Sequence, residues 1–249
     1  MARITLEDVF VDLPVFEGRH RSLRRTLLDI SVGGQILPRV GRHSAIRALD
    51  GINLSLVDGD RVGLIGHNGS GKSTLLRVLA GIFQPTSGSA TIDGRVAALL
   101  NQDTVLDPGM TGYENINHAA VLLGIRRRDL MDEIATFTQL GDFLNLPVKT
   151  YSAGMRLRIS FALMTAQEVD ILLLDEVLAV GDARFAVHAV KRMTAFAERA
   201  CIIVLATHNP DEILRMCNKV LWLDHGRIAG FGEAQQILDA YAAHVAAVP

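Results

Sequence analysis

A nine-residue glycine-rich stretch constrains this chain more than any other part of its sequence. It fits the pattern G-x-x-x-x-G-K-[ST] of a phosphate-binding loop and consists of Gly66, His67, Asn68, Gly69, Ser70, Gly71, Lys72, Ser73 and Thr74. A mostly apolar run at 61–65 precedes it with the length of a buried strand, and three leucines follow it at helical spacing. Strand, glycine loop and helix in this order are the context in which the pattern binds phosphate.

The residue types in this loop suit an anion. Glycines let backbone N–H groups turn inward around a phosphate, and the N-terminus of the following helix adds partial positive charge. Lys72 has the length to reach the outer phosphates of a nucleotide, and Ser73 carries a hydroxyl that can bind Mg²⁺. The alternative is a glycine-rich turn with an accidental lysine, and the flanking strand and helix weigh against it.

Length, charge and cysteine content narrow the class of protein. The 249 residues suffice for one large or two small domains with a real core. A net charge of −2 does not suggest a nucleic-acid-binding protein, which usually carries a basic excess. The two cysteines form no disulfide framework and suggest reduced thiols in the cytosol. No apolar run approaches the roughly 20 residues of a membrane span, and we expect no signal peptide.

The rest of the chain alternates predicted strands and helices. Alternating or short apolar runs predict strands at 4–16, 45–57, 89–92, 96–100, 169–174 and 201–206, with a hairpin at 220–229. Helical spacing appears within 112–137, 152–166, 185–197 and 233–244. This alternation favours an α/β fold with a largely parallel sheet, in which residues about 103–165 form a helical insertion. The arginines 126–128 are interpreted as a solvated turn.

A short basic helix is predicted between the first two strands. Leu23, Leu27 and Ile30 lie on one helical face, and Arg24 and Arg25 lie off it. One interpretation is a solvated surface helix. The other is a helix at the cytosolic face of a membrane, with its arginines near anionic headgroups.

Acidic and polar residues follow the predicted strands downstream of the loop. In α/β sheets, ligands bind outside the carboxyl ends of parallel strands. Asp175 ends one apolar strand and is predicted to hold Mg²⁺, and Glu176 is the candidate general base for a water that attacks the γ-phosphate. His208 follows the next buried strand and can orient that water, with a purely structural role as the alternative. Gln102 can sense the metal from the start of the helical insertion.

A second candidate anion site opens the helix that begins near residue 152. Ser152, Ala153 and Gly154 combine a hydroxyl, small side chains and free N–H groups. One nucleotide does not need two γ-phosphate sites in one chain. Two sites become sensible if two chains meet head to tail, each supplying one half; alone, the triplet is an ordinary N-cap.

Taken in order, these motifs resemble those of the ATP-binding-cassette (ABC) ATPases over essentially the whole chain. The order is GHNGSGKST, Gln102, YSAGM, ILLLDE, AVGD and His208. The resemblance implies an ATP-binding Walker A loop at 66–74, a Q-loop at Gln102, a signature at 152–155, the Walker B residue Asp175, the catalytic Glu176, a D-loop at 179–182 and the switch residue His208. The implied Mg²⁺ ligands are Ser73, Gln102 and Asp175.

The same resemblance implies a fold and its division. The family has a RecA-like mixed or parallel sheet core, an N-terminal antiparallel β subdomain and a helical insertion subdomain. Here residues 1–102 and 166–249 correspond to the β subdomain plus core, and about 103–165 to the helical signature subdomain. Since the chain ends at Pro249, no C-terminal carbohydrate-binding domain is expected.

Two departures from the usual motifs point to one branch of the family. Tyr-Ser-Ala-Gly-Met at 151–155 replaces Leu-Ser-Gly-Gly-Gln, and Ala-Val-Gly-Asp at 179–182 replaces Ser-Ala-Leu-Asp. Both variants resemble the ATPase subunits of polysaccharide exporters of the O-antigen, capsule and teichoic-acid types, as does the inserted helix at 23–30. The aromatic residue that usually stacks on adenine is missing, and His43 or Arg47 is the predicted substitute.

The implied function is an ATP-hydrolysing subunit that powers export of a lipid-linked polysaccharide across the cytoplasmic membrane. It implies a homodimer beneath two permease subunits, bound peripherally at the cytoplasmic face, with ATP between Walker A of one chain and Ser152–Gly154 of the other. No nucleic-acid partner is expected. The alternatives are the ATPase of another ABC transporter, for small solutes, and a soluble ABC protein of DNA repair or translation.

Overall fold

The chain forms two compact units. The computed structural model describes residues 1–15, 35–40, 43–100, 106–175 and 183–247. The first, here called the sheet unit, comprises Met1–Leu100, Asp170–Val177 and Cys201–Pro249; the second, the helical unit, comprises Asn101–Val169 and Leu178–Ala200. Among the described residues, no helix is both long enough and apolar enough to cross a membrane.

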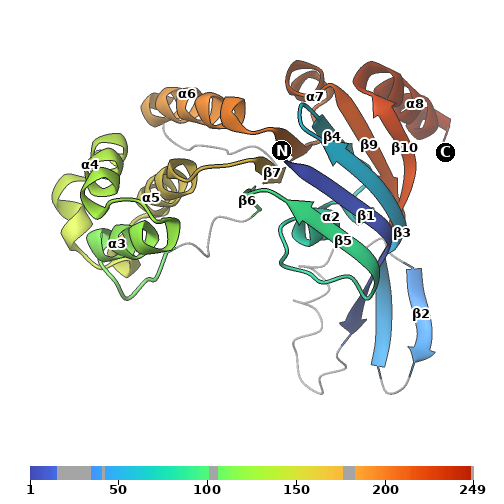
Figure 1. Ribbon diagram of the computed structural model, residues 1–249, viewed down its shortest axis with the longest axis horizontal. Helices are drawn as coiled ribbons and strands as arrows, with labels where there is room; N and C mark the ends of the chain where they lie inside the picture. The colour runs from blue at the N-terminus through green and yellow to red at the C-terminus, as the bar shows by residue number, and fades with distance from the viewer. Residues whose placement is uncertain (16–34, 41–42, 101–105, 176–182, 248–249) are drawn as a thin grey trace. The chain divides into compact units, whose positions relative to one another are not determined.

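One sheet of the sheet unit is antiparallel. Its order is β2 (Gln35–Val40), β3 (His43–Val57), β1 (Arg3–Val15) and β5 (Ser87–Asp93) (Figure 1). Strand β1 pairs with β3 in a register that sets Ile4 opposite Leu56. The alternation predicted for β1 is present, because Ile4 and Leu6 are buried while Arg3 and Glu7 are exposed. Strand β2 was not predicted from the sequence.

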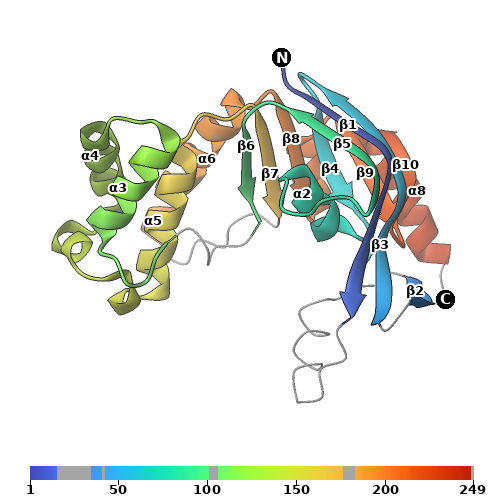
Figure 2. The ribbon, with the colours of Figure 1, turned by 60° about the horizontal axis from the view of Figure 1, so that its bottom comes forward.

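The other sheet carries the parallel strands that the sequence predicts. Its order is β10 (Arg227–Glu233), β9 (Lys219–Asp224), β4 (Arg61–Ile65), β8 (Ile202–Ala206), β7 (Ile171–Asp175) and β6 (Val96–Leu99) (Figure 2). All neighbouring pairs are parallel except the β9–β10 hairpin. Strand β8 lies between β4 and β7, so the carboxyl ends of these three strands share one edge.

The core of the sheet unit lies between the two sheets, around helix α2 (Lys72–Leu79) (Figure 2). The leucines predicted to face inward, Leu75, Leu76 and Leu79, are fully buried there. They pack in one cluster with residues of β1, β3, β4, β7 and β8. Burial of this kind contributes roughly 1.5–3 kcal/mol per large apolar side chain, so the two sheets and α2 stabilise one another.

Two further helices of the sheet unit lie in the described part of the chain: α7 (Pro210–Met216) and α8 (Ala234–Ala247). Helix α7 was not predicted, although its start has a clear signal: the Asn209 side chain caps it by accepting from the Asp211 N–H, and proline opens the first turn. Its buried Ile213 fills the space beside Gly63 of β4. Both cysteines are free, and burial raises the pKa of Cys217 to about 12, so this thiol stays protonated.

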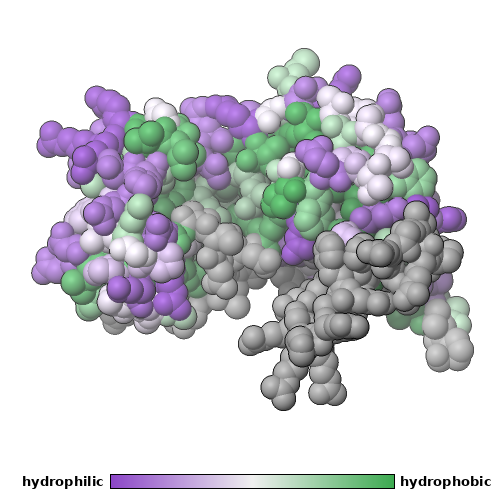
Figure 3. All heavy atoms as spheres, turned by 90° about the horizontal axis from the view of Figure 1, so that it is seen from below, coloured by the Kyte–Doolittle hydropathy of each residue, from purple (hydrophilic) through white to green (hydrophobic). Residues whose placement is uncertain are grey.

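The helical unit contains α3 (Gly112–Leu123), α4 (Arg127–Thr138), α5 (Ala153–Ala166) and α6 (Ala183–Arg199), with 3₁₀ turns at Gly141–Asn145 and Val148–Thr150. Its core includes Ile116, Leu130, Ile134, Ile159 and Leu163. Helix α3 starts at a capping box, in which Thr111 and Glu114 satisfy each other's backbone N–H groups. The side of this unit seen in Figure 3 is largely hydrophilic.

The arginine triplet corrects one prediction. Only Arg126 precedes the helix, and Arg127 and Arg128 lie in the first turn of α4. The turn interpretation was wrong for these two because arginine has good helix propensity, and Arg126 and Arg128 form surface ion pairs with Asp129 and Asp132 along α4.

An aromatic cluster explains why α6 belongs to the helical unit. The rings of Phe137 and Phe185 lie 5.2 Å apart, and those of Phe137 and Phe161 lie 5.8 Å apart. The guanidinium of Arg192 sits 4.6 Å from the centre of the Phe137 ring and also donates to the carbonyl of Ala162. These contacts join α4, α5 and α6 around apolar rings rather than around a continuous leucine face.

An ion pair secures the amino ends of β6 and β7. Arg95 donates to the Asp170 carboxylate through its backbone N–H (2.8 Å), its Nε (2.9 Å) and its Nη2 (3.1 Å). The Arg95 side chain, and then its backbone N–H, lower the pKa of Asp170 from 3.8 to about 2 by hydrogen bonding to the charged form.

The lowered pKa of Asp170 predicts a pH-dependent contribution to stability. This contribution is complete above the ordinary pKa of 3.8 and is lost as the pH falls towards 2, where the folded protein must also take up the proton. We expect Asp170→Asn to lower the urea midpoint at neutral pH, and the gap between wild type and variant to close as the pH falls from about 5 to about 2. Equilibrium urea unfolding across this pH range measures the gap.

A matched control removes one carboxylate elsewhere. Asp129 pairs with Arg126 at the exposed start of α4, so Asp129→Asn changes the net charge equally without touching the sheet edge. Its midpoint should stay close to that of wild type at every pH. A gap between wild type and Asp170→Asn that stays constant down to the lowest pH would contradict the assignment.

Candidate functional site

The glycine loop between β4 and α2 fits into the sheet unit only because it lacks side chains at two positions. Gly66 has φ of 144°, and a Cβ there would lie 2.2 Å from the Leu223 carbonyl oxygen. Gly71 has φ of 107°, and its Cβ would lie 2.7 Å from the carbonyl oxygen of Ala48. Backbone therefore packs directly on backbone at both ends of the loop.

The loop has the features of an anion cradle. Gly71 is the N-cap of α2 and provides no side-chain cap, so the first N–H groups of the helix are left for a ligand. Lys72 Nζ donates to the carbonyl oxygens of Gly66 (2.6 Å) and His67 (2.9 Å), which keeps the ammonium beside the loop. Ser70 is fully buried, and its Oγ has no hydrogen-bond partner in the described part of the chain.

The structure brings Ser73 and Asp175 together. Ser73 Oγ, in the first turn of α2, donates to Oδ2 of Asp175 at the end of β7, at 3.1 Å. These two residues are 102 positions apart in the sequence. A hydroxyl and a carboxylate are hard oxygen ligands of the type that Mg²⁺ prefers, so these two residues fit the ion.

His208 lies at the same edge of the sheet. It comes two residues after β8, the strand between β4 and β7, and its side chain is exposed. The backbone next to it is fixed, because Thr207 Oγ1 donates to Glu212 (2.8 Å) and accepts from the Asn209 N–H (3.2 Å). The structure thus shows that His208 follows a buried strand, and its role at the nucleotide stays a prediction.

Several predicted residues lie outside the described residues. These are Gln102, Glu176, the D-loop at 179–182 and the basic helix at 23–30, so their roles stay predictions. The same holds for the side chain of His43. Arg47, the other candidate for the adenine contact, forms a two-pronged ion pair with Asp12 and lies 5.1 Å from the centre of the Phe10 ring. Its guanidinium is therefore already fixed by neighbours within the sheet unit.

The triplet at 152–154 belongs to the helical unit, at the exposed start of α5. Ser152 acts as the N-cap and accepts from the Met155 N–H at 3.2 Å. The preceding Tyr151 is buried, its hydroxyl donates to the Phe143 carbonyl (2.7 Å), and burial raises its pKa. Where the usual signature begins with leucine, this chain has a tyrosine that is buried and also makes a hydrogen bond. Ser152 is therefore an N-cap, and the first turn of α5 is also exposed, so a ligand can reach it.

One neighbour of the loop was missed from the sequence. The turn between β9 and β10 lies against the loop, where the Gly226 N–H donates to the Ser70 carbonyl at 2.9 Å. The sequence predicts this turn from Asp-His-Gly at 224–226, but nothing in the local pattern indicates that it reaches the loop.

Known proteins match this chain along most of its length. The family model described as ABC transporter matches residues 49–179. The O-antigen export system ATP-binding protein RfbE of Yersinia enterocolitica is 41% identical over 241 residues, which cover 96% of this chain and 100% of that protein. The teichoic acids export ATP-binding protein TagH of Enterococcus faecalis is 39% identical over 79% of this chain and 44% of its own length.

A solved structure supports the fold. The dimeric structure of the ATP-binding cassette MJ0796 in a post-hydrolysis state, bound to ADP and Pi, superposes with a TM-score of 0.64 at 19% identity. The match covers 93% of this chain and 98% of that one. The α/β fold with an antiparallel sheet, a mainly parallel sheet and separate helices is thus confirmed. From the family match and these relatives together, this chain belongs to the ABC transporter family, among relatives that include ATP-binding proteins of polysaccharide export systems.

Proposed function

We propose that this chain is the ATP-hydrolysing subunit of an ABC transporter that exports a lipid-linked polysaccharide. The observation that carries the enzymatic part is the meeting of Ser73 and Asp175 beside the glycine loop and Lys72. The substrate class is supported by the 41% identity to an O-antigen export protein over nearly the whole chain. The variant signature anchored by Tyr151 is consistent with the same branch.

The residues of the sheet unit divide the work at the nucleotide. The loop N–H groups and Lys72 bind the phosphates; Ser73 and Asp175 would hold Mg²⁺, which would supply charge neutralisation at the phosphates. Glu176 follows Asp175 in the chain and takes the proton of the attacking water, with His208 orienting that water. Gln102, which lies between Ser73 and Asp175 in the sequence, is the third proposed ligand of the ion.

We propose a homodimer in which each nucleotide is bound by two chains. The exposed first turn of α5, with Ser152, Ala153 and Gly154, supplies the second half of the site. Shifting a two-state equilibrium from mostly open to mostly closed takes about 5.5 kcal/mol of differential affinity. The proposed source of that energy is the pair of shared γ-phosphate sites with their charge-assisted hydrogen bonds.

The dimer is proposed to sit at the cytoplasmic face of the membrane beneath two permease subunits. The helical unit offers an apolar contact for them, because Val121 and Leu122 at the end of α3 are 77% and 86% exposed. The basic helix predicted at 23–30 is proposed to lie near the lipid-linked substrate, where its arginines face pyrophosphate or lipid headgroups.

The pairing of Ser73 with Asp175 predicts an altered metal requirement. Ser73→Ala removes one Mg²⁺ ligand and leaves the glycine loop intact. We expect the Mg²⁺ concentration for half-maximal ATPase activity to rise about tenfold or more, as for loss of an interaction that supports a metal site. Ser89→Ala removes an exposed hydroxyl on β5 and should leave the Mg²⁺ curve unchanged. Identical Mg²⁺ curves for Ser73→Ala and wild type would contradict the assignment.

The general-base role predicts a separation of binding from hydrolysis. Glu176→Gln keeps the size of the side chain but cannot take up a proton, so steady-state ATPase activity should fall by about 100-fold or more. ATP binding should persist, and the variant should elute as a dimer in ATP and as a monomer without it. Hydrolysis at the wild-type rate would refute the base assignment, and a strictly monomeric ATP-bound variant would refute the shared site.

The basic helix predicts an export defect without an ATP-binding defect. Arg24→Glu with Arg25→Glu reverses the charge that is proposed to face the substrate, so polysaccharide at the cell surface should fall while ATP affinity stays unchanged. The matched control is Arg127→Glu with Arg128→Glu, an exposed adjacent pair on α4. Normal surface polysaccharide in the first double variant would count against the substrate role.

A further inference from the structure

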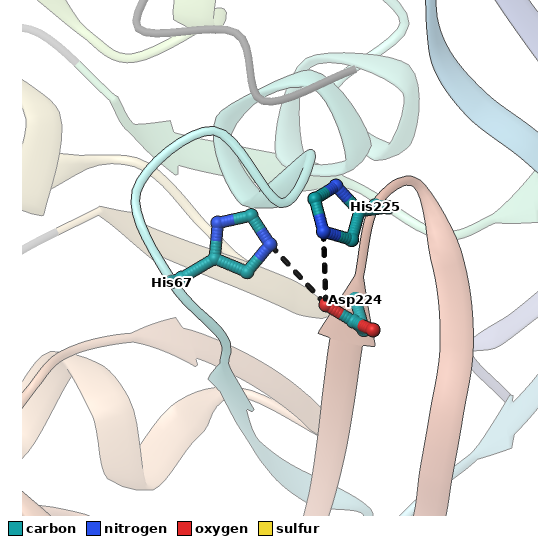
Figure 4. Close-up of side chains that lie close together, drawn as sticks. All are labelled: His67, Asp224 and His225. Atoms are coloured by element: carbon teal, nitrogen blue, oxygen red, sulfur yellow. Dashed lines mark ion pairs between the residues drawn. The ribbon is translucent and has the colours of Figure 1, made fainter. Parts of the chain in front are cut away.

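Three potential metal ligands gather next to the glycine loop. His67 comes from the loop, Asp224 from the end of β9, and His225 from the turn that follows it (Figure 4). Oδ1 of Asp224 lies 3.2 Å from Nε2 of His67 and 3.8 Å from Nε2 of His225. One ligand atom from each residue lies within 4.8 Å of the others, so a single ion can reach all three.

The β9–β10 hairpin, which supplies two of these ligands, has a turn that is held firmly in place. His225 and Gly226 both have positive φ, 44° and 79°, as a two-residue hairpin turn of type I′ requires. The Gly226 N–H donates to Ser70 and its carbonyl accepts from the Asp50 N–H, each at 2.9 Å. The cluster therefore joins two backbone segments that are already fixed against each other.

The hydrogen bonding of His67 points to a cation. Nδ1 of His67 lies 2.8 Å from the Asn68 carbonyl oxygen, which can only accept, so Nδ1 carries the proton. In the neutral ring, Nε2 then presents a lone pair to the Asp224 carboxylate, which also presents lone pairs. Nε2 is buried and makes no hydrogen bond within the described part of the chain, despite the 3.2 Å separation. Two acceptors this close need either a second proton on the imidazole or a metal ion between them.

This arrangement has the form of a metal-binding histidine. Such a histidine binds the ion through one nitrogen and donates from the other to a carbonyl or carboxylate, which fixes its orientation. A tetrahedral zinc site with bonds of about 2.0–2.2 Å places its ligand atoms roughly 3.3–3.5 Å apart. The two separations from Asp224, 3.2 and 3.8 Å, lie on either side of that range, and the two imidazoles present ligand atoms within 4.8 Å of each other, so side-chain shifts that bring the imidazoles together complete the site.

We propose that His67, Asp224 and His225 form a binding site for a divalent transition-metal ion of the zinc type. Two imidazoles and one carboxylate favour Zn²⁺, Co²⁺ or Ni²⁺ over Mg²⁺, which prefers oxygen ligands. The fourth position of the ion is open to water. The bound ion cross-links the glycine loop to the β9–β10 turn, and the site does not depend on nucleotide hydrolysis.

Cobalt is a direct probe of this site in the nucleotide-free, full-length chain. We expect one equivalent of Co²⁺ per chain to bind with the visible absorption of tetrahedral cobalt, and Zn²⁺ to displace it. The test variant is His225→Asn, because asparagine tolerates the left-handed backbone of the turn and does not replace the imidazole. Loss of this ligand should weaken Zn²⁺ binding, measured by chelator competition, by about tenfold or more. His118→Asn, an exposed histidine on α3, should bind as wild type does.

The outcomes of these experiments distinguish a metal site from a simple ion pair. If wild type shows no tetrahedral cobalt spectrum, the pair of His67 and Asp224 is an imidazolium–carboxylate ion pair and the proposal is overturned. Equal Zn²⁺ affinity in His225→Asn and His118→Asn overturns it as well. Thermal unfolding without metal shows whether His225→Asn folds as wild type does. Asp224→Asn removes a second ligand, and a cobalt spectrum that survives in this variant also contradicts the site.

Discussion

The structure depends on a close approach of backbone to backbone at the two ends of the glycine loop. At Gly66 the carbonyl of Leu223 occupies the space of a side chain, and at Gly71 the carbonyl of Ala48 does so. These contacts place the loop against β9 and β3, and the loop in turn places the N-terminus of α2 at the edge of the parallel sheet. Any side chain at either position displaces the anion cradle itself.

The order of the parallel strands decides which polar residues lie beside the loop in the sheet unit. Because β8 separates β4 from β7, the loop, His208 and Asp175 leave the sheet along one edge. Ser73 and Asp175 meet there across 102 positions of sequence. In the helical unit, the buried Tyr151 holds the start of α5. The ring cluster around Phe137 holds the neighbouring helices together. Each unit thus presents its own polar site on a separate apolar core.

Much of the fold was predictable because its signals are local. The glycine loop, the leucines of α2, the alternation in β1 and the apolar β7 and β8 each follow from spacing within a few residues. Strand β2 and helix α7 were missed, since one follows a segment with a helical pattern and the other spans only seven residues. The turn interpretation of the α4 arginines left out their good helix propensity and the leucine and isoleucine that follow at helical spacing.

The sequence alone determined which residues can carry the chemistry: the loop glycines, Lys72, Ser73, Asp175 and His208 are identified by pattern and by position after strands. Only the tertiary structure decided which of them meet. It paired Ser73 with Asp175, engaged Arg47 with Asp12, and set the β9–β10 turn beside His67. The physical reason is that sheet order and turn placement arise from packing between segments distant in the chain, and no local pattern of residues encodes those distances.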